Sequence, residues 1–140
     1  MSLAELLKKD LVRKSEPDRN QALELLASAE RDLKAANDNL ASSNYDWALA
    51  ISYNSMLSSG RALMANKGYI PVTEAHHLAV VRFCDAVLQS KTNFGGTFNK
   101  YRVRRHNVVY GAAGSVGREE AETSIKNAEL FYKCIRGTIK

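Results

Sequence analysis

The sequence predicts an all-α protein, an up-and-down bundle of five to six helices. Three observations support this fold class. Proline occurs only at positions 17 and 71, apolar residues recur at spacings of three and four, and no strand-length run shows sustained alternation. With 140 residues, 45% of them hydrophobic and 25% charged, the chain fits one globular domain over residues 1–140.

The first two helices are predicted from the spacing of their apolar residues and from a helix-start signal that separates them. We expect a short amphipathic helix from Leu3 to about Arg13. The segment 15–18, with Ser15 as the cap and Pro17 in the first turn, is typical of a helix start. The second helix then continues to Leu40, and its inward face is marked by Ala22, Leu25, Leu26, Ala29, Leu33, Ala36 and Leu40.

The third helix is predicted from about Tyr45 to Asn66. Gly68 suits a left-handed C-terminal cap, and Pro71 follows it. One side of this helix carries only small residues, which lets a neighbouring helix approach closely. These residues are Ala48, Ser52, Ser55, Ser59 and Ala62.

Three further helices follow. Thr73 can cap a helix from Glu74 to about Gln89, and we expect this helix to be the most buried because apolar residues cover most of its circumference. A fifth helix spans about Phe94 to Tyr110 and leads into a glycine-rich connector. The sixth runs from about Arg118 to Arg136 and has glutamates in its first turn, which suit the positive end of the helix dipole.

Charge and cysteine usage limit the classes of function. A net charge of +5 permits a polyanionic partner without requiring one. Cys84 and Cys134 lie in apolar helical surroundings without zinc spacing, so we expect two buried free thiols in a reducing, cytoplasmic compartment. The chain has no signal-peptide pattern and no run of about 18 apolar residues, so we expect no membrane span.

Arg105 is the most informative single residue. It lies on a helical stripe whose other members are apolar or aromatic, and a guanidinium there must find a carboxylate, a phosphate or a water-filled cleft. It also belongs to the densest basic segment of the chain, residues 101–107. The stripe consists of Phe94, Phe98, Tyr101, Arg105, Val108 and Val109.

Two interpretations of this segment stay open. Arg102, Arg105 and His106, with Lys100, could hold a phosphate, and His106 could then act as an acid or a base. Alternatively, Arg102 and Arg104 are solvated, and Arg105 pairs with an acid of a neighbouring helix.

No other catalytic or cofactor motif is present. His76 and His77 are adjacent on a helix and point about 100° apart, so they cannot chelate one metal from one face, and we expect no metal and no cofactor. There is no nucleophile elbow, no Walker loop and no dinucleotide-binding turn.

Several segments, in order along nearly the whole chain, resemble the HEPN family (higher eukaryotes and prokaryotes nucleotide-binding). They are residues 29–36, 45–57, 61–64, 68–69, 76–81 and 105–111. The resemblance implies a bundle of four or five helices that is usually dimeric. It also implies an RNA- or nucleotide-related function, since many members are metal-independent endoribonucleases, often toxins paired with a nucleotidyltransferase antitoxin.

The family signature is an arginine, commonly followed by a polar residue, with a histidine four to six positions beyond the arginine. Arg105 matches the arginine by its place on the penultimate helix, whereas the histidine position falls on Tyr110. A phenol, with a reference pKa of about 10, is a poor base at neutral pH.

Three functions follow from these observations. The first is a homodimeric nucleotide- or RNA-binding domain that lacks strong nuclease activity. Its binding residues would be Arg102, Arg104, Arg105, Asn107 and Tyr110. The second is an endoribonuclease that uses Arg105 with His106 or Tyr110, and the third is a non-catalytic interaction module in which Arg105 forms a structural ion pair.

Overall fold

The computed structural model describes residues 1–72, 76–88, 94–111 and 114–139. Six helices and two short strands lie within these ranges. The helices are α1 (Leu3–Lys8), α2 (Arg19–Ala41), α3 (Tyr45–Lys67), α4 (His76–Leu88), α5 (Phe94–Tyr110) and α6 (Arg118–Thr138), and the strands are β1 (Val12–Lys14) and β2 (Tyr69–Pro71).

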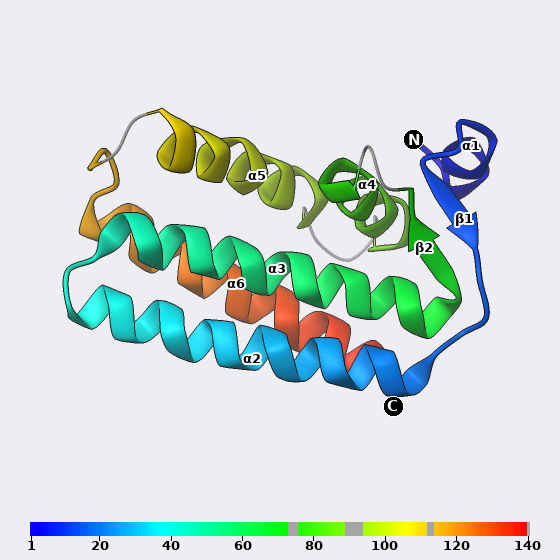
Figure 1. The fold of residues 1–140 in the computed structure, drawn as a ribbon, viewed down its shortest axis with the longest axis horizontal. Coiled ribbons are helices and arrows are strands. Elements are labelled where there is room, and N and C mark those ends of the chain that lie inside the picture. Colours follow the sequence, from blue (N-terminus) through cyan, green and yellow to red (C-terminus); the bar gives the residue numbers. More distant parts are fainter. Residues whose placement is uncertain (73–75, 89–93, 112–113, 140) are drawn as a thin grey trace.

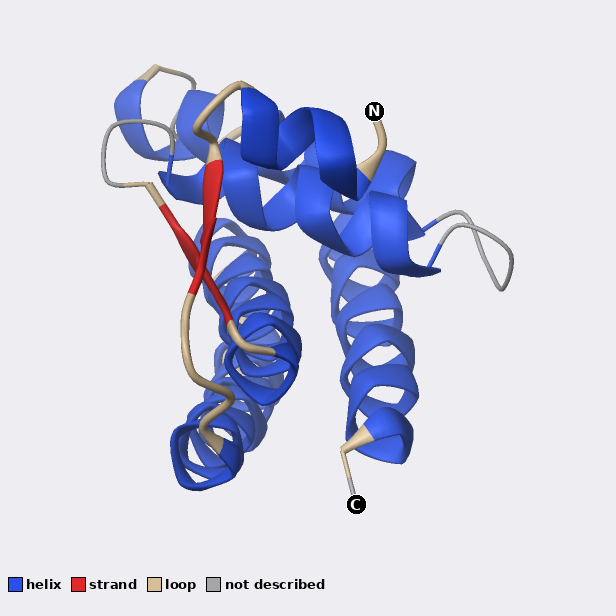
Figure 2. Cartoon of the chain, turned by 90° about the vertical axis from the view of Figure 1, so that its right-hand side faces the viewer, coloured by secondary structure: helices blue, strands red, loops and turns tan. Residues whose placement is uncertain are grey.

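The predicted all-α, up-and-down bundle is confirmed. The long helices α2, α3, α5 and α6 alternate in direction along the chain, and α3 lies between α2 on one side and α5 on the other (Figure 1). The two strands form one small antiparallel sheet at an end of the bundle (Figure 2). The sheet closes the N-terminal segment onto the end of α3.

Helix α3 is the centre of the core. Among the described residues, 14 of the 23 in α3 are buried, against 6 of the 13 in α4. The expectation that the fourth helix is the most buried was therefore wrong. The reason is that α3 packs against α2, α4, α5 and α6 at once, whereas α4 covers only one end of the bundle.

The small residues of α3 set how closely its neighbours approach. The Ser52 hydroxyl donates to the Ser124 hydroxyl of α6 at 2.9 Å, and the Ser55 hydroxyl donates to the Ala29 carbonyl of α2 at 2.9 Å. A Cβ atom at Gly60 would lie only 2.6 Å from a methyl group of Val80 in α4. The predicted close approach at the small residues is confirmed for α6 at Ser52 and for α2 at Ser55, whereas Gly60, which meets α4, lies outside the predicted stripe.

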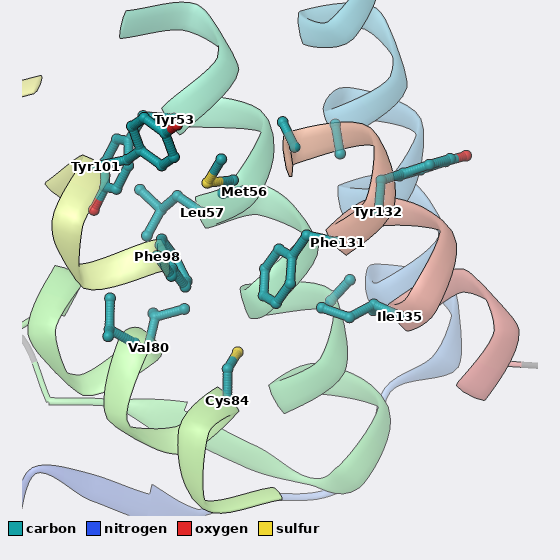
Figure 3. Packing of buried hydrophobic residues seen from close by; sticks show 14 of the residues in the cluster. Tyr53, Met56, Leu57, Val80, Cys84, Phe98, Tyr101, Phe131, Tyr132 and Ile135 are labelled. Carbon is teal, nitrogen blue, oxygen red and sulfur yellow. The ribbon is translucent and has the colours of Figure 1, made fainter. Parts of the chain in front are cut away.

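Aromatic rings fill the space between α3, α5 and α6. Phe98 of α5 lies between Tyr53 of α3 and Phe131 of α6, with ring centroids 5.6 Å and 5.3 Å apart (Figure 3). All three side chains are almost fully buried. This cluster fixes α5 against the two long helices, and α5 carries the basic segment.

The N-terminal segment differs from its prediction. The first helix ends at Lys8 rather than at about Arg13, and Asp10 adopts a left-handed backbone conformation with a φ of 56°. Val12–Lys14 then pairs with Tyr69–Pro71 as an antiparallel strand. Three residues are too few to show alternation, and their pairing partner lies far along the sequence, so the pattern did not reveal this strand.

The start of α2 also differs. Asp18, not Ser15, is the N-cap, and its carboxylate accepts a hydrogen bond from the Gln21 N–H at 2.9 Å. Ser15 stays outside the helix because its N–H donates to the Gly68 carbonyl at 2.8 Å. The predicted cap at Thr73 and the predicted helix ends at Glu74 and Gln89 lie outside the described residues.

Gly68 ends α3 as predicted, with a φ of 83°. A Cβ atom at this position would lie 2.7 Å from the Ser15 carbonyl oxygen, so both the backbone conformation and the close contact require glycine. We expect Gly68→Ala to lower the free energy of unfolding by about 1–3 kcal/mol in urea denaturation.

The matched control is Gly137→Ala in the last turn of α6, where an added Cβ atom meets nothing within 4 Å. That variant should be neutral or more stable by up to about 1 kcal/mol, because alanine favours the helix. Equal destabilisation by both substitutions would show that Gly68 has no special role.

Candidate functional site

Helix α5 presents its inward stripe to the core largely as predicted. Phe98, Tyr101 and Val108 are buried, and Arg105 on the same stripe is half-buried. Val109 is 42% exposed, so its predicted burial was wrong. Val108 makes the inward contact of the last turn, which turns the next residue toward solvent. The side chain of Phe94 lies outside the described residues.

The Arg105 guanidinium is directed at α3 and has no acidic partner there. Its central carbon lies 6.0 Å from the centroid of the buried Tyr53 ring, a cation–π distance. Its Nε atom is buried without a hydrogen-bond partner. Among the described residues, no carboxylate pairs with this guanidinium. The prediction that Arg105 pairs with an acid of a neighbouring helix therefore finds no such pair here.

Tyr53 connects Arg105 to a histidine of α4. The Tyr53 hydroxyl and His77 Nδ1 share a hydrogen bond of 3.2 Å, whose direction depends on the imidazole tautomer. Burial raises the pKa of the Tyr53 hydroxyl to about 12, although the positive charges of Arg102 and Arg105 oppose the shift. The phenol is therefore protonated at neutral pH and remains a fixed, neutral surface beneath the guanidinium.

His77 lies in a field of positive charge. Burial lowers its pKa below the usual 6.5, and the neighbouring charges lower it further, first His76 and then Arg105, Arg61 and Arg102. The imidazole is accordingly neutral at pH 7. These positive charges would attract an anion such as a phosphate or a carboxylate, and a bound anion would offset them.

Arg102 adds a second cation beside Arg105. Its Nε donates to the Asn99 side-chain oxygen at 3.0 Å, and it pairs with no carboxylate among the described residues. Arg102 and Arg105 both influence Tyr53 and His77. We define the two cations Arg102 and Arg105 as the α5 basic cluster, which is bordered by Tyr53 of α3 and His77 of α4.

Arg104 is used differently. Its guanidinium donates to both carboxylate oxygens of Glu120, at 2.7 Å and 2.9 Å, and to the Ser115 carbonyl at 3.2 Å. These bonds raise the pKa of Arg104 and lower that of Glu120. The pair joins α5 to the first turn of α6. The predicted exposure of Arg104 to solvent is thus replaced by an ion pair.

The remaining predicted site residues lie on the outer face of α5. His106, Asn107 and Tyr110 are exposed, and Tyr110 is the most exposed of the large apolar and aromatic side chains at 72%. The His106 and Tyr110 rings lie 4.9 Å apart. The structure therefore separates the predicted site into an inward part with Arg102 and Arg105, an outward part with these three residues, and Arg104 bound to α6.

Sequence reasoning missed Tyr53 and His77. For His76 and His77 the sequence offered a metal site and, as the favoured alternative, one imidazole packed inside the bundle; the part of the chain that the structure describes contains no group of three or more residues suited to a metal ion. The imidazole packing that the sequence suggested as the alternative is present in His77, whose ring lies 5.7 Å from that of Tyr53. Nothing in the local sequence indicates that α4 meets the middle of α3.

These features define the class of the protein as an all-α bundle with an unneutralised basic cluster on its penultimate helix. The family model of the HEPN domain matches residues 22–138, and the chain belongs to the HEPN domain family. This family has a nucleotide- or RNA-related fold. The search of curated proteins found no match for the chain. No helix within the described ranges combines the length and apolar character that a bilayer crossing requires.

The lowered pKa of His77 predicts how stability depends on pH. A histidine whose pKa is lower in the folded state than in the unfolded state contributes stability above about 6.5 that is lost as pH falls through the folded pKa. The pKa of His76 is also lowered, by burial and by Arg61, and acts in the same direction. We expect the urea concentration at the midpoint of unfolding to decrease when the pH is lowered from 7.5 to 5.

His77→Gln should flatten this pH dependence, because the variant has no imidazole to charge beside the α5 basic cluster. His106→Gln is the matched control, since it removes an exposed histidine from the outer face of the same region. If both variants changed the slope equally, its assignment to His77 would be incorrect.

Proposed function

We propose that this HEPN domain binds a nucleotide or RNA through the α5 basic cluster and has no strong nuclease activity of its own. One observation carries the proposal: the half-buried Arg105 guanidinium, whose Nε is buried without a partner. An unpaired cation is costly to desolvate, and a phosphate is the ligand that its planar fork fits best. Arg102 supplies the second positive charge.

The other predicted binding residues differ in how freely they could contact a ligand. Asn107 and Tyr110 are exposed on the same helix and are free to contact a sugar or a base that extends beyond the phosphate. Arg104 would have to leave Glu120 before it could bind a ligand. We therefore propose Arg104 as a residue that orients α5 rather than as a primary phosphate contact.

Weak or absent catalysis follows from the position that the family signature assigns to histidine. Tyr110 occupies that position. A phenol donates a hydrogen bond well but is a poor proton acceptor at neutral pH. The alternative function, a metal-independent endoribonuclease, is supported by the His106 ring, which lies 4.9 Å from Tyr110 and could act as the acid or base in its place.

The interaction-module alternative required a structural ion pair at Arg105. Within the described chain, the ion pair between α5 and α6 belongs to Arg104 instead. This arrangement favours a ligand-binding role for Arg105 over a purely structural one.

We propose that the protein is a cytoplasmic homodimer. By analogy with other family members, its proposed partner is a nucleotidyltransferase antitoxin. Cys84 is a buried free thiol as predicted, whereas Cys134 is free but only half-buried; a reducing compartment stays part of the proposal. A patch of exposed apolar and aromatic side chains lies where α3 begins and α5 ends, and it includes Trp47 (62% exposed), Val109 and Tyr110. A second copy of the chain would cover this patch and bring two α5 helices together.

The binding proposal predicts that Arg105→Met weakens binding of a single-stranded oligoribonucleotide at least tenfold. Methionine retains packing against Tyr53 but lacks the charge. The slope of log affinity against log salt should decrease by roughly one unit, because about one phosphate contact is lost. Fluorescence anisotropy at several salt concentrations measures both effects.

The control is Arg31→Met, which removes the same charge from the exposed surface of α2, on the other side of α3 from α5 (Figure 1). Equal losses in both variants would contradict a specific role for Arg105. RNA cleavage in EDTA by the wild type but not by Arg105→Met would overturn the non-catalytic part of the proposal, and would make His106 and Tyr110 the next residues to substitute.

The dimer proposal predicts that Trp47→Glu yields a monomer of 15.5 kDa, whereas the wild type sediments at twice that mass. A buried carboxylate without a partner strongly disfavours an interface. Leu130→Glu is the control, because Leu130 is a comparably exposed apolar residue (54%) on α6. Dissociation by Leu130→Glu alone would place the interface elsewhere, and a monomeric wild type would overturn the dimer.

A further inference from the structure

A second basic site lies at the opposite end of α3 from the apolar patch. It is a pocket of about 290 Å³ between the start of α2, the end of α3, β2 and the start of α4. Its polar wall consists of Gln21, Arg61, Tyr69 and His76, and its remaining lining is apolar. No carboxylate is present among the described residues that line it.

Arg61 is the principal cation of this pocket. Its side chain is half-buried, and burial lowers its pKa below the usual 12.5. Among the described residues it forms no ion pair. An arginine that is partly desolvated and not neutralised destabilises the free protein, so its location in a pocket calls for an anionic ligand.

His76 provides the second, independent observation. Its Nε2 atom is buried and has no hydrogen-bond partner. Burial lowers the pKa of this imidazole, and the positive charge of Arg61 lowers it further. A buried polar atom is normally satisfied by protein or water, and His76 lines the pocket, so a ligand that displaces the atoms covering Nε2 would satisfy it.

We propose that this pocket binds the terminal phosphate of a nucleotide, with Arg61 as the charged fork and His76 Nε2 as a hydrogen-bond donor to the phosphate. The Gln21 amide is a further polar group at the rim, and Leu25 and Ile70 provide apolar surface for the rest of the ligand. The volume lies at the lower end of the roughly 300–1,000 Å³ of small-molecule sites. It therefore suits a mononucleotide or one end of a single strand, not a duplex.

The pocket and the α5 basic cluster border the same residue. His77 follows His76 directly, and its pKa responds to Arg61 as well as to Arg102 and Arg105. A single-stranded RNA could therefore place its 5′-phosphate at Arg61 while its backbone contacts Arg105. Phosphate binding in the pocket depends on Arg61 and His76 alone and holds whether or not the α5 basic cluster binds RNA.

The first experiment is a calorimetric titration of the full chain with adenosine 5′-monophosphate and, for comparison, adenosine. We expect saturable binding of the monophosphate, at least tenfold weaker binding of adenosine, and a loss of at least tenfold in Arg61→Leu. His76→Asn should also weaken binding, because its shorter amide leaves the Nε2 position vacant. Arg31→Met, on the exposed surface of α2, should keep the wild-type affinity within about twofold.

A thermal melt separates a ligand-binding role from a structural one. If Arg61 is unneutralised in the free protein, Arg61→Leu and Arg61→Gln should melt at or above the wild-type temperature. Lower melting temperatures for both variants would show that Arg61 has a structural partner and would overturn the proposal. Monophosphate affinity that is unchanged in Arg61→Leu would overturn it as well.

The source of the phosphate is tested with a ten-residue oligoadenylate that carries either a 5′-phosphate or a 5′-hydroxyl. A preference for the phosphorylated strand over the hydroxyl strand, lost in Arg61→Leu and kept in Arg31→Met, supports an RNA end as the ligand. Equal affinity for the two strands, together with Arg61-dependent monophosphate binding, supports a free mononucleotide. A phosphoserine peptide that binds more tightly than the monophosphate through Arg61 would overturn the nucleotide assignment.

Oligonucleotide binding that depends on Arg105 but not on Arg61 would leave the proposed function intact and remove only the pocket. Monophosphate binding that depends on Arg61, with no oligonucleotide binding at all, would support the pocket and contradict the proposed RNA binding through the α5 basic cluster.

Discussion

The close packing of α3 against four neighbours is the constraint on which the rest of the structure depends. A helix surrounded on all sides cannot carry large side chains everywhere, and α3 uses a different small residue for each close contact. Ser55 meets α2, Ser52 meets α6, and Gly60 meets α4. The buried hydroxyls of Ser52 and Ser55 both form hydrogen bonds, so neither adds the cost of an unpaired buried polar atom.

The candidate site inherits its rigidity from this packing. Tyr53 is fully buried on α3, yet it contacts the core through Phe98 and the site through Arg105 and His77. The basic cluster is therefore positioned by helices rather than by loops, and a ligand would meet a preorganised arrangement of charges. A shift of α5 relative to α3 would disturb the core cluster before it could change the site.

Local sequence signals predicted the long helices well because their apolar periodicity is sustained, and Gly68 marks the end of α3. Tyr45 and Gly68 bound α3, and α5 runs from Phe94 to Tyr110, as the sequence indicated. The strand at Val12–Lys14 could not be predicted, since its pairing with β2 is nonlocal. Helical periodicity also predicted that Arg105 points inward, but periodicity gives a direction and not a partner.

The exchange of roles between Arg104 and Arg105 illustrates this limit. Both carry the same charge one residue apart, and about 100° of rotation separates them on the helix. Arg104 faces Glu120 in the first turn of α6, whereas Arg105 faces the Tyr53 ring. The ion pair to a neighbouring helix, which one interpretation of the sequence placed at Arg105, is thus made by Arg104. Tyr53 and His77 joined the site for the same reason, since only the folded chain brings α4 to the middle of α3.

Two partly buried arginines, Arg61 and Arg105, pair with no carboxylate among the described residues, and both act on His77. Positive charge that is held apart from carboxylates is unfavourable for the free protein, and a protein under selection for stability alone would pair it or replace it with apolar residues. An anion that binds only the folded state would relieve this repulsion and stabilise the fold in proportion to its concentration. It would also raise the pKa of His77, because the repulsion from Arg61 and Arg105 would be offset. Under the proposed binding, ligand affinity, stability and the protonation of His77 would all be linked through the same few charges.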